Sequence, residues 1–513
     1  MKKNTYYGII DIGSNTVRLV VYQIQPQMVY NEVQNVKLPV RLYQYLNDKN
    51  ELTQEGIDKL IEVMEVYNQI TAHYPLEKLI ATATAVIRQS KNSEEVLSTV
   101  KKVTGISLRL LSEEEEAFYG QYAIARTTAF SEGYTVDMGG GSTEITYFKD
   151  NEIVDSHSFP FGVVTLKNKF FKDDLPGEED TLKKVKHFLK EQFETLPWLV
   201  KKEIPIIAIG GSSRNIASVH EQMTDYPVVG IHQYEMKQKD LKETFDLFTS
   251  LSLDELQSLD GLSKDRADII IPANLTFISL MEQVDSKKFI FCNNGLREGL
   301  LMEEINRYFP EAFTTTNIAE TSVQRFVETY QVDVSRSNKR IEMMKLFVKE
   351  LSDKQILTAD KEKLISYLAF GAQLYLIGSA IEEDDSPFHS FYLLANSNLN
   401  GFTHKQRIAL ALLASYKNKS FFKLLSKPFK KWFTEEELGL LRRAGGLTKF
   451  VEALNVTSVN DVRSFSLTEK ANKYVLAIEW SFDPLAETYR GNRQKKHLEN
   501  VLQKKVVLDF KIK

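Results

Sequence analysis

Two short segments of the chain combine an aspartate with glycine and hydroxyl residues. They are Asp11–Thr16 (DIGSNT) and Asp137–Glu144 (DMGGGSTE). Glycine lets backbone N–H groups approach an anion closely, the hydroxyl and amide side chains add donors, and aspartate can hold a hydrated divalent cation or orient water. Neither segment contains the Gly-Lys-Ser/Thr ending of a Walker loop. Either segment alone is also compatible with an ordinary turn.

The spacing of the two segments carries more information than either one. Asp11 and Asp137 lie 126 residues apart, and each ends a predicted strand. Such internal similarity predicts two related lobes. We expect the two turns to face each other and to clamp phosphate across a cleft.

A third glycine turn follows the strand-like stretch IPIIAI and leads into a predicted helix at Gly210-Gly211-Ser212-Ser213. The N-terminus of that helix could bind an anion. The alternative is an ordinary helix start in which Ser212 or Ser213 is the N-cap.

Two further segments contain charged residues at predicted helix starts. Arg88 follows a strand within ATATAVIRQSKN, where a guanidinium could grip phosphate through two hydrogen bonds, although a surface arginine is the simpler interpretation of this residue alone. Ser112 precedes four glutamates. Capping and the helix dipole account for three of them, which leaves a catalytic role open for Glu116.

Hydrophobic periodicity predicts the elements that position these residues. Residues 6–24 form two strands around the first turn, and strands 134–137 and 143–148 flank the second turn. The other predictions in the first 300 residues are strands at 34–43, 78–84 and 107–111, helices at 54–72, 92–103 and from Ser112, and then a helix at 179–195, the strand IPIIAI, another helix and the strand KFIFC.

Helices replace the alternating pattern after about residue 315, with predicted spans 318–331, 337–353, 360–381 and 405–416. The last 50 residues predict a small α/β module, in which the strands KYVLAIEW and KKVVLDFKI flank a helix at 485–503. We therefore expect four domains, at residues 1–125, 126–305, 306–450 and 451–513.

Composition is that of an ordinary globular protein, with 43% hydrophobic and 26% charged residues in 513. No apolar run is long enough to cross a membrane, no leader pattern opens the chain, and Cys292 is the single cysteine. The expected location is the cytoplasm, with neither a membrane nor a nucleic acid as partner.

The charge of the chain is unevenly distributed. Residues 401–513 carry a net charge of +11, whereas the other 400 residues carry −15. This distribution indicates an anion-binding surface near the C-terminus, or simply a solvated basic face. The candidate lysines are Lys417, Lys419, Lys423, Lys427, Lys430 and Lys431.

The motifs together resemble the exopolyphosphatase / guanosine pentaphosphate phosphatase family of the actin-like ATPase superfamily. The resemblance is carried by DIGSNTVRL, ATATAVIRQSKN, LSEEEEAFYG, VDMGGGSTEI and AIGGSSRNIA, in this order, and further by FPFGVVTL, GLSKDRADIIIPA and GLREGLL. It covers residues 5–305 with high specificity. It implies an α/β fold of two actin-like (ribonuclease H-like) lobes around a cleft, and it suggests a homodimer.

The resemblance also implies roles for individual residues. Glu116 matches the general base, Arg88 the phosphate-gripping arginine, and Asp11, Asp137 and Glu144 the acidic positions around Mg²⁺ (or Mn²⁺). The phosphate cradle matches Ser14, Asn15, Gly140, Gly141, Ser142 and Thr143, to which the turn chemistry adds Gly13, Gly139, Gly210, Gly211 and Ser212.

The C-terminal half departs from the pattern of the longer family members, which carry a helical domain similar to HD-type phosphohydrolases. Tyr375 and Leu376 stand where those members have a His-Asp pair, and Tyr416 stands where a further histidine is expected. His389 remains without obvious ligand partners. We therefore expect a degenerate, catalytically silent HD-like domain.

These observations predict an exopolyphosphatase that releases terminal orthophosphate from inorganic polyphosphate by attack of a glutamate-activated water. A guanosine pentaphosphate 5′-phosphohydrolase is the first alternative, because both reactions cleave a terminal phosphoanhydride. A non-catalytic phosphate or nucleotide sensor is the second alternative.

Overall fold

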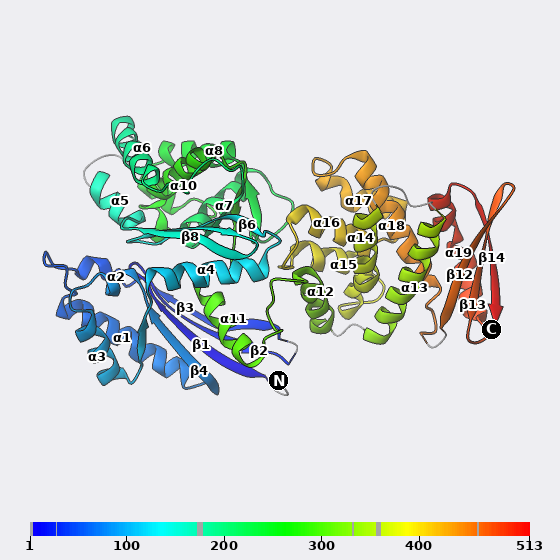
Figure 1. The fold of residues 1–513 in the computed structure, drawn as a ribbon, viewed down its shortest axis with the longest axis horizontal. Coiled ribbons are helices and arrows are strands. Elements are labelled where there is room, and N and C mark those ends of the chain that lie inside the picture. Colours follow the sequence, from blue (N-terminus) through cyan, green and yellow to red (C-terminus); the bar gives the residue numbers. More distant parts are fainter. Residues whose placement is uncertain are drawn as a thin grey trace. The chain divides into compact units, whose positions relative to one another are not determined.

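The computed structural model describes residues 4–26, 28–171, 178–330, 333–354, 361–458 and 461–512, without the side chains of 361–366. It divides into two compact units (Figure 1). The first comprises Met1–Tyr226 and Ile231–Ile318, and the second comprises Pro227–Gly230 and Ala319–Lys513. The predicted four-domain division stays a prediction.

The first lobe of unit one is built on a five-stranded sheet in the order β3-β2-β1-β4-β5. Strands β1, β2 and β3 form an antiparallel meander, and β4 and β5 run parallel to β1. The strands are β1 (Thr5–Ile12), β2 (Val17–Ile24), β3 (Tyr30–Leu38), β4 (Leu76–Ala83) and β5 (Leu108–Leu110).

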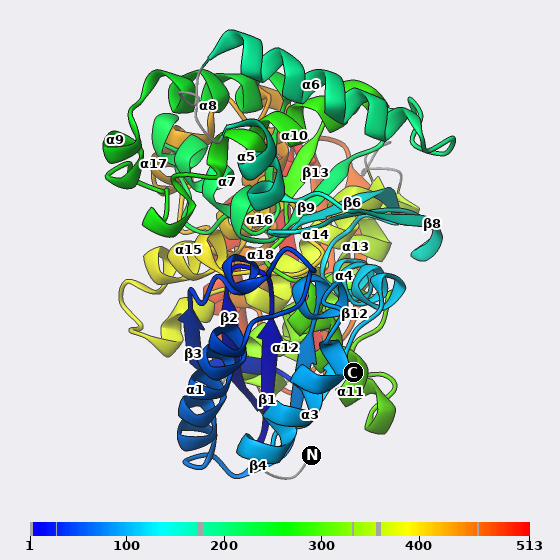
Figure 2. The ribbon, with the colours of Figure 1, turned by 90° about the vertical axis from the view of Figure 1, so that its left-hand side faces the viewer.

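Alternating side chains of this sheet form two cores. Ile10 and Ile12 of β1 pack with α1 (Gln54–Thr71) and α3 (Ser93–Thr104), which lie along one face of the sheet (Figure 2). Ile9, the residue before Ile10, belongs to the core of the opposite face, with Leu301 and Met302 of α11 (Leu296–Tyr308). This alternation is the two-residue period of a strand buried on both sides.

The second lobe repeats the connectivity of the first. Its sheet has the order β10-β11-β9-β6-β7-β8, in which β6, β7 and β8 form the meander and β9 and β11 are the parallel strands. The strands are β6 (Glu132–Met138), β7 (Thr143–Lys149), β8 (Glu152–Phe159), β9 (Ile206–Ile209), β10 (Tyr234–Met236) and β11 (Phe289–Phe291). The shared topology agrees with the two related lobes predicted from the repeated motif.

Helices surround the second sheet and lie beside the first. Around the second sheet are α5 (Val163–Phe170), α6 (Glu179–Glu194), α7 (Gly211–Met223), α8 (Gln238–Ser250), α9 (Leu253–Gln257) and α10 (Ile270–Val284). Helix α4 (Glu113–Thr127) contacts α11 on one side and β7 and β8 of the second sheet on the other (Figure 1). Its N-terminal turn contains Glu116, so both lobes determine where that residue lies.

Several sequence predictions were incomplete. The strand expected at 34–43 runs from Tyr30 to Leu38, and Leu42–Tyr45 is a short 3-10 helix. The sequence pattern did not predict six of the observed elements, which are strands β8 and β10 and helices α5, α8, α9 and α10. Strand β8 reads EIVDSHSF, in which apolar and polar residues do not alternate regularly, so its hydrophobic pattern is weak.

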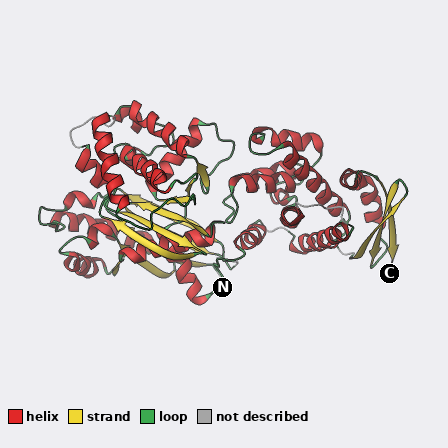
Figure 3. Ribbon diagram, turned by 45° about the horizontal axis from the view of Figure 1, so that its top comes forward, coloured by secondary structure: helices red, strands yellow, loops and turns green. Residues whose placement is uncertain are grey.

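Unit two is helical except for its C-terminal end, where strands reappear (Figure 3). The helices are α12 (Ile318–Thr329), α13 (Val334–Asp353), α14 (Lys361–Leu374), α15 (Ser386–Asn396), α16 (His404–Ala414), α17 (Lys419–Ser426), α18 (Glu435–Ala453) and α19 (Leu485–Leu502). The single helix predicted at 360–381 was wrong, because α14 ends at Leu374 and Leu376 has a positive φ of 58°. Residue 360 lies outside the described residues.

The C-terminal sheet has the order β12-β13-β14, with β12 (Val462–Lys470), β13 (Lys473–Trp480) and β14 (Lys505–Ile512). Strands β13 and β14 and the helix between them match the predicted module, whereas β12 was missed. Among the described residues, no helix has both the length and the apolar character that crossing a membrane requires.

Candidate active site

The two Asp-Gly turns have the same hydrogen-bonded geometry and face each other. The N–H of Gly13 donates to the carbonyl of Thr16 at 3.0 Å, and the N–H of Gly139 donates to the carbonyl of Ser142 at 3.0 Å. A Cβ placed on Gly140 would lie 3.2 Å from Cβ of Ser14. Glycine at 140 therefore permits the close approach of the two turns that the repeated motif predicts.

Each turn is also held by a backbone hydrogen bond from a later segment of its own lobe. The carbonyl of Asn15 accepts a hydrogen bond from the N–H of Arg41 at 2.9 Å, and the carbonyl of Gly140 accepts one from Val164 at 3.0 Å. Gly162 packs so tightly that an added Cβ would lie 2.4 Å from the carbonyl oxygen of Gly139. Ser14, Asn15, Ser142 and Thr143 are all buried, so the turns are rigid parts of the lobes.

The third glycine turn lies beside Asp137. Gly210 has a φ of 95°, and a Cβ there would lie 2.9 Å from Oδ1 of Asp137. Neither Ser212 nor Ser213 is the N-cap of α7, because that position is Gly210. Instead the Ser212 hydroxyl accepts a hydrogen bond from Nη1 of Arg266 at 3.2 Å. All three turns thus meet at one place in unit one.

Glu116 turns inward from the first turn of α4, unlike its neighbours. Ser112 and Glu115 form the capping box, with the Glu115 N–H donating to the Ser112 hydroxyl at 3.2 Å. The side chain of Glu116 is 13% exposed, against 48% for Glu113. Glu115 therefore serves to cap the helix. Glu116 instead lines a pocket together with Asp137 and Glu144.

Arg88, the last residue of α2 (Ala85–Arg88), forms an ion pair with Glu116. Its Nη1 also donates to the carbonyl of Leu111 at 2.9 Å. Its Nε and Nη2 are buried and have no hydrogen-bond partner among the described residues. These unsatisfied donors are suited to phosphate oxygens.

The carboxyl groups of the pocket are held in unfavourable surroundings for negative charge. Burial, and next the charge of Asp11, raise the pKa of Asp137 to about 6, while Arg297 and Arg266 act in the opposite direction. Burial and the charge of Asp137 raise the pKa of Glu144, although hydrogen bonds from Ser142 and Ser158 oppose the rise.

The base candidate shows the same effect. Burial and the charge of Glu144 raise the pKa of Glu116, against the opposing influence of Arg88. Burial likewise raises the pKa of Asp11, which is countered by the charge of Arg297. The negative charge of this group of carboxylates is thus incompletely neutralised, and such groups mark functional sites.

Four arginines that the sequence reasoning did not assign surround the carboxylates: Arg18, Arg214, Arg266 and Arg297. Nη1 of Arg297 lies 3.3 Å from Oδ2 of Asp11. After burial, the positive charges of Arg297 and Arg214 are the largest influences that lower the pKa of Arg18. This mutual repulsion indicates an anion site. All four arginines stand inside quoted motifs, DIGSNTVRL, AIGGSSRNIA, GLSKDRADIIIPA and GLREGLL, which was the available signal.

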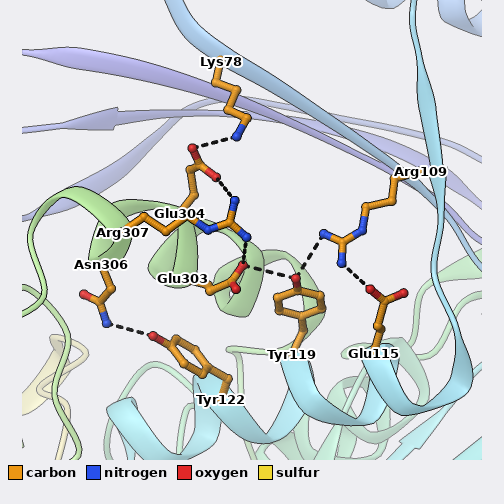
Figure 4. Close-up of polar contacts among 9 residues, drawn as sticks. All are labelled: Lys78, Arg109, Glu115, Tyr119, Tyr122, Glu303, Glu304, Asn306 and Arg307. Atoms are coloured by element: carbon orange, nitrogen blue, oxygen red, sulfur yellow. Dashed lines mark hydrogen bonds and ion pairs between the residues drawn. The ribbon is translucent and has the colours of Figure 1, made fainter.

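A polar network between β5, α4 and α11 fixes the two helices that carry Glu116 and Arg297 (Figure 4). Arg109 pairs with Glu115 and donates to the Tyr119 hydroxyl at 3.1 Å, which in turn donates to Glu303 of α11 at 3.2 Å. Arg307 contacts Glu303 at 3.0 Å. Helices α4 and α11 are thereby tied to β5 and to each other.

The carboxylates of Asp11, Asp137 and Glu144 are a donor set that fits a hydrated, hard divalent cation. Among the described residues, only His220, Asp240 and Glu243 bring three His, Cys, Asp or Glu ligand atoms within 4.8 Å of one another. Asp11, Asp137 and Glu144 therefore do not converge that tightly. Mg²⁺ commonly binds through one or two carboxylates and keeps several waters, so their oxygen chemistry and uncompensated charge suit it.

The second unit contains the remaining candidates. All six lysines between Lys417 and Lys431 are exposed. At the position of the expected HD-type ligands, the hydroxyl of buried Tyr375 donates to the carbonyl of Tyr416 at 3.1 Å. The HD-like character of this region and the role of the lysines stay predictions.

Comparison with known proteins gives matches along most of the chain. The model of the Ppx/GppA phosphatase family matches residues 20–308, and that of Ppx/GppA phosphatase domain III matches residues 318–442. The chain is 27% identical over 324 residues to Exopolyphosphatase 1 of Mycobacterium bovis and of Mycobacterium tuberculosis, covering 62% of this chain and 93% of each relative.

Solved structures match the same part of the chain. A Ppx/GppA family member from Aquifex aeolicus is similar with a TM-score of 0.53 and 28% identity, covering 60% of this chain and 99% of that one. An exopolyphosphatase from Cytophaga hutchinsonii has a TM-score of 0.54 at 20% identity, covering 59% and 98%, and supports the fold alone. The predicted actin-like fold is confirmed. Since the family model spans more than half of its residues, the chain belongs to the Ppx/GppA phosphatase family and is a phosphoanhydride hydrolase.

Proposed function

We propose that this chain is an exopolyphosphatase, which releases terminal orthophosphate from inorganic polyphosphate. The observation that carries the proposal is the inward-facing Glu116, which is paired with Arg88 and shares a pocket with Asp137 and Glu144. The curated relatives named exopolyphosphatase support the choice of substrate.

The glycine turns and the arginines bind the terminal phosphates. Arg88 offers Nε and Nη2, which make no hydrogen bond among the described residues, to the phosphoryl group that is transferred. Arg18, Arg214 and Arg297 neutralise the phosphates that follow it. Because these groups are held by rigid elements, they stabilise charge at little reorganisation cost.

Glu116 acts as the general base. It takes a proton from a water molecule, whose oxygen forms a bond to the terminal phosphorus as the bridging P–O bond breaks. The electron pair of that bond leaves with the shortened chain, and orthophosphate is released. A base whose pKa lies near the working pH is effective in this role, and burial moves the pKa of Glu116 in that direction.

We infer that Asp11, Asp137 and Glu144 hold Mg²⁺ or Mn²⁺, partly through water. When bound, the cation neutralises phosphate charge. Without a cation these carboxylates would repel a polyanion, which is why the activity should require the metal.

The exposed lysines of unit two provide a surface for long chains, because a flexible polyanion needs charge more than a fixed geometry. We further propose a cytoplasmic homodimer. The intact base and carboxylates argue against a non-catalytic sensor.

Guanosine pentaphosphate is the alternative substrate, because the same residues would cleave its terminal phosphoanhydride. The test is orthophosphate release by the pure full-length chain from long-chain polyphosphate, tripolyphosphate and guanosine pentaphosphate, each with Mg²⁺. We expect the highest kcat/KM with long-chain polyphosphate. A higher value for guanosine pentaphosphate would replace the proposed substrate, and no release from any of the three would overturn hydrolysis.

A further inference from the structure

A second group of ligand-type side chains lies in the second lobe, away from the three glycine turns. His220 stands in the last turn of α7, and Asp240 and Glu243 stand in the first two turns of α8. One ligand atom of each residue lies within 4.8 Å of the other two. Nε2 of His220 is 3.9 Å from Oδ1 of Asp240.

His220 is buried, and only one of its two ring nitrogens makes a hydrogen bond among the described residues. Its side chain is 7% exposed, and Nδ1 lies 2.8 Å from the hydroxyl of Tyr234. Nε2 has no hydrogen-bond partner among the described residues, and the distance to Asp240 is too long for a hydrogen bond. A buried, unsatisfied ring nitrogen that faces two carboxylates is costly unless another group is bound there.

We propose that His220, Asp240 and Glu243 bind one divalent transition-metal ion of the zinc type. One imidazole and two carboxylates, with water in the fourth position, form a ligand set that Zn²⁺ accepts. Two ligand atoms of a tetrahedral zinc site are roughly 3.4 Å apart, so closing the 3.9 Å gap needs only a small movement.

The surroundings of the histidine favour metal binding. Burial lowers the pKa of His220 despite the opposing charges of Asp240 and Glu243. Metal binding uses the neutral form of the ring. Tyr234 holds the ring through Nδ1, which is how outer groups orient metal-ligating histidines. The C-terminal end of α7 also attracts a cation.

Two existing contacts are compatible with the ion. Oδ2 of Asp240 accepts a hydrogen bond from the N–H of Lys237 at 2.7 Å, which leaves Oδ1 for the metal. The ammonium of Lys239 lies 3.7 Å from Oδ1, but this side chain is 70% exposed and such pairs contribute little. Because α7 begins at Gly211, the ion would anchor the far end of the helix that carries Ser212 and Arg214.

The test is calorimetric titration of the metal-stripped full-length chain with Zn²⁺, in excess Mg²⁺ to occupy the active-site carboxylates. The decisive variant is Glu243→Gln, which alters an exposed side chain and preserves its shape. The matched control is Asp246→Asn, which removes one charge from an exposed position one turn further along α8. His220→Gln removes the nitrogen ligand.

We expect one Zn²⁺ per chain for the wild type and for Asp246→Asn, at least a tenfold weaker affinity for Glu243→Gln, and loss of the site in His220→Gln. Zn²⁺ should raise the Tm of the wild type and of Asp246→Asn but not that of Glu243→Gln. No Zn²⁺ binding by the wild type, or equal affinity in Glu243→Gln and Asp246→Asn, would overturn the proposal. If His220→Gln does not fold, Glu243→Gln still decides.

Discussion

Arg18 and Glu144 occupy equivalent positions in the two lobes. Arg18 is directly opposite Asp11 across β1 and β2, and Glu144 is directly opposite Asp137 across β6 and β7. Directly opposed residues share one face of a sheet, so each lobe presents a pair of charged side chains beside its glycine turn. At this position the first lobe therefore carries a cation and the second lobe an anion.

Replacing Arg18 should weaken substrate binding at the first turn. A hydrogen bond to a charged group contributes about 1.5–3 kcal/mol, so Arg18→Gln should lower kcat/KM for tripolyphosphate roughly 10- to 100-fold. Arg18→Lys keeps the charge but loses the planar guanidinium, so its kcat/KM should lie between those of the wild type and Arg18→Gln. Steady-state kinetics on all three proteins measure this. An unchanged kcat/KM in Arg18→Gln would remove Arg18 from the phosphate site.

The metal-free protein should lose stability in unit one as the pH rises. Burial raises the folded-state pKa of Asp137 to about 6 and raises those of Glu144 and Glu116, whereas unfolded carboxyls titrate near pH 4. Between about pH 4 and beyond pH 6 the folded state therefore holds more protons. Its unfolding free energy falls across that window, by on the order of 1–3 kcal/mol for a group such as Asp137.

Hydrogen exchange of the β6 and β9 amides at several pH values measures this loss in unit one alone. Glu144→Gln should reduce the loss, and excess Mg²⁺ should reduce it in the wild type, because the cation stabilises the ionised carboxylates. The same pH dependence in Glu144→Gln as in the wild type would show that Glu144 does not contribute to it.

Removing the C-terminal lysine charges should affect long substrates more than short ones. We expect tripolyphosphate to contact the glycine turns alone, whereas a long chain must extend over the surface, and residues 1–400 carry a net charge of −15. Converting all six lysines to glutamine should raise the KM for long-chain polyphosphate at least several-fold, and added salt should raise the wild-type KM as well. The six lysines are Lys417, Lys419, Lys423, Lys427, Lys430 and Lys431.

A matched control removes six other exposed lysine charges from the same unit: Lys345, Lys349, Lys470, Lys473, Lys496 and Lys511. It should leave both KM values nearly unchanged. An equal effect of the two six-site variants, or an equal effect on short and long substrates, would contradict a specific surface and favour guanosine pentaphosphate as the substrate.

The sequence predicted the glycine turns well because their chemistry is local. Gly13 and Gly139 appear in the same place relative to their aspartates, so one turn predicted the other. For the four glutamates after Ser112, capping and the helix dipole accounted for three and left a catalytic role open for Glu116, and the capping box agrees with that first step. The family resemblance, not the local pattern, then singled out Glu116 as the base.

The arginines could not be found in the same way. Arg297 reaches Asp11 from 286 residues away in sequence, and nothing in the local pattern of GLREGLL distinguishes a buried cation from a surface one. Strand β8 escaped detection because its apolar residues, Ile153, Val154 and Phe159, do not alternate with polar ones, and β10 because it spans only three residues. Such features depend on tertiary contacts.

The most direct measurement of the central claim is orthophosphate release from long-chain polyphosphate by Glu116→Gln beside Glu114→Gln. Both variants make the same chemical change in the first turn of α4, but only Glu116 faces the pocket, whereas Glu114 is exposed. Losing a positioned base costs roughly 10²- to 10⁴-fold, so kcat of Glu116→Gln should fall by that factor while polyphosphate binding and Tm persist. Glu114→Gln should behave as the wild type. Near-normal turnover by Glu116→Gln, or an equal loss in both variants, would contradict the account.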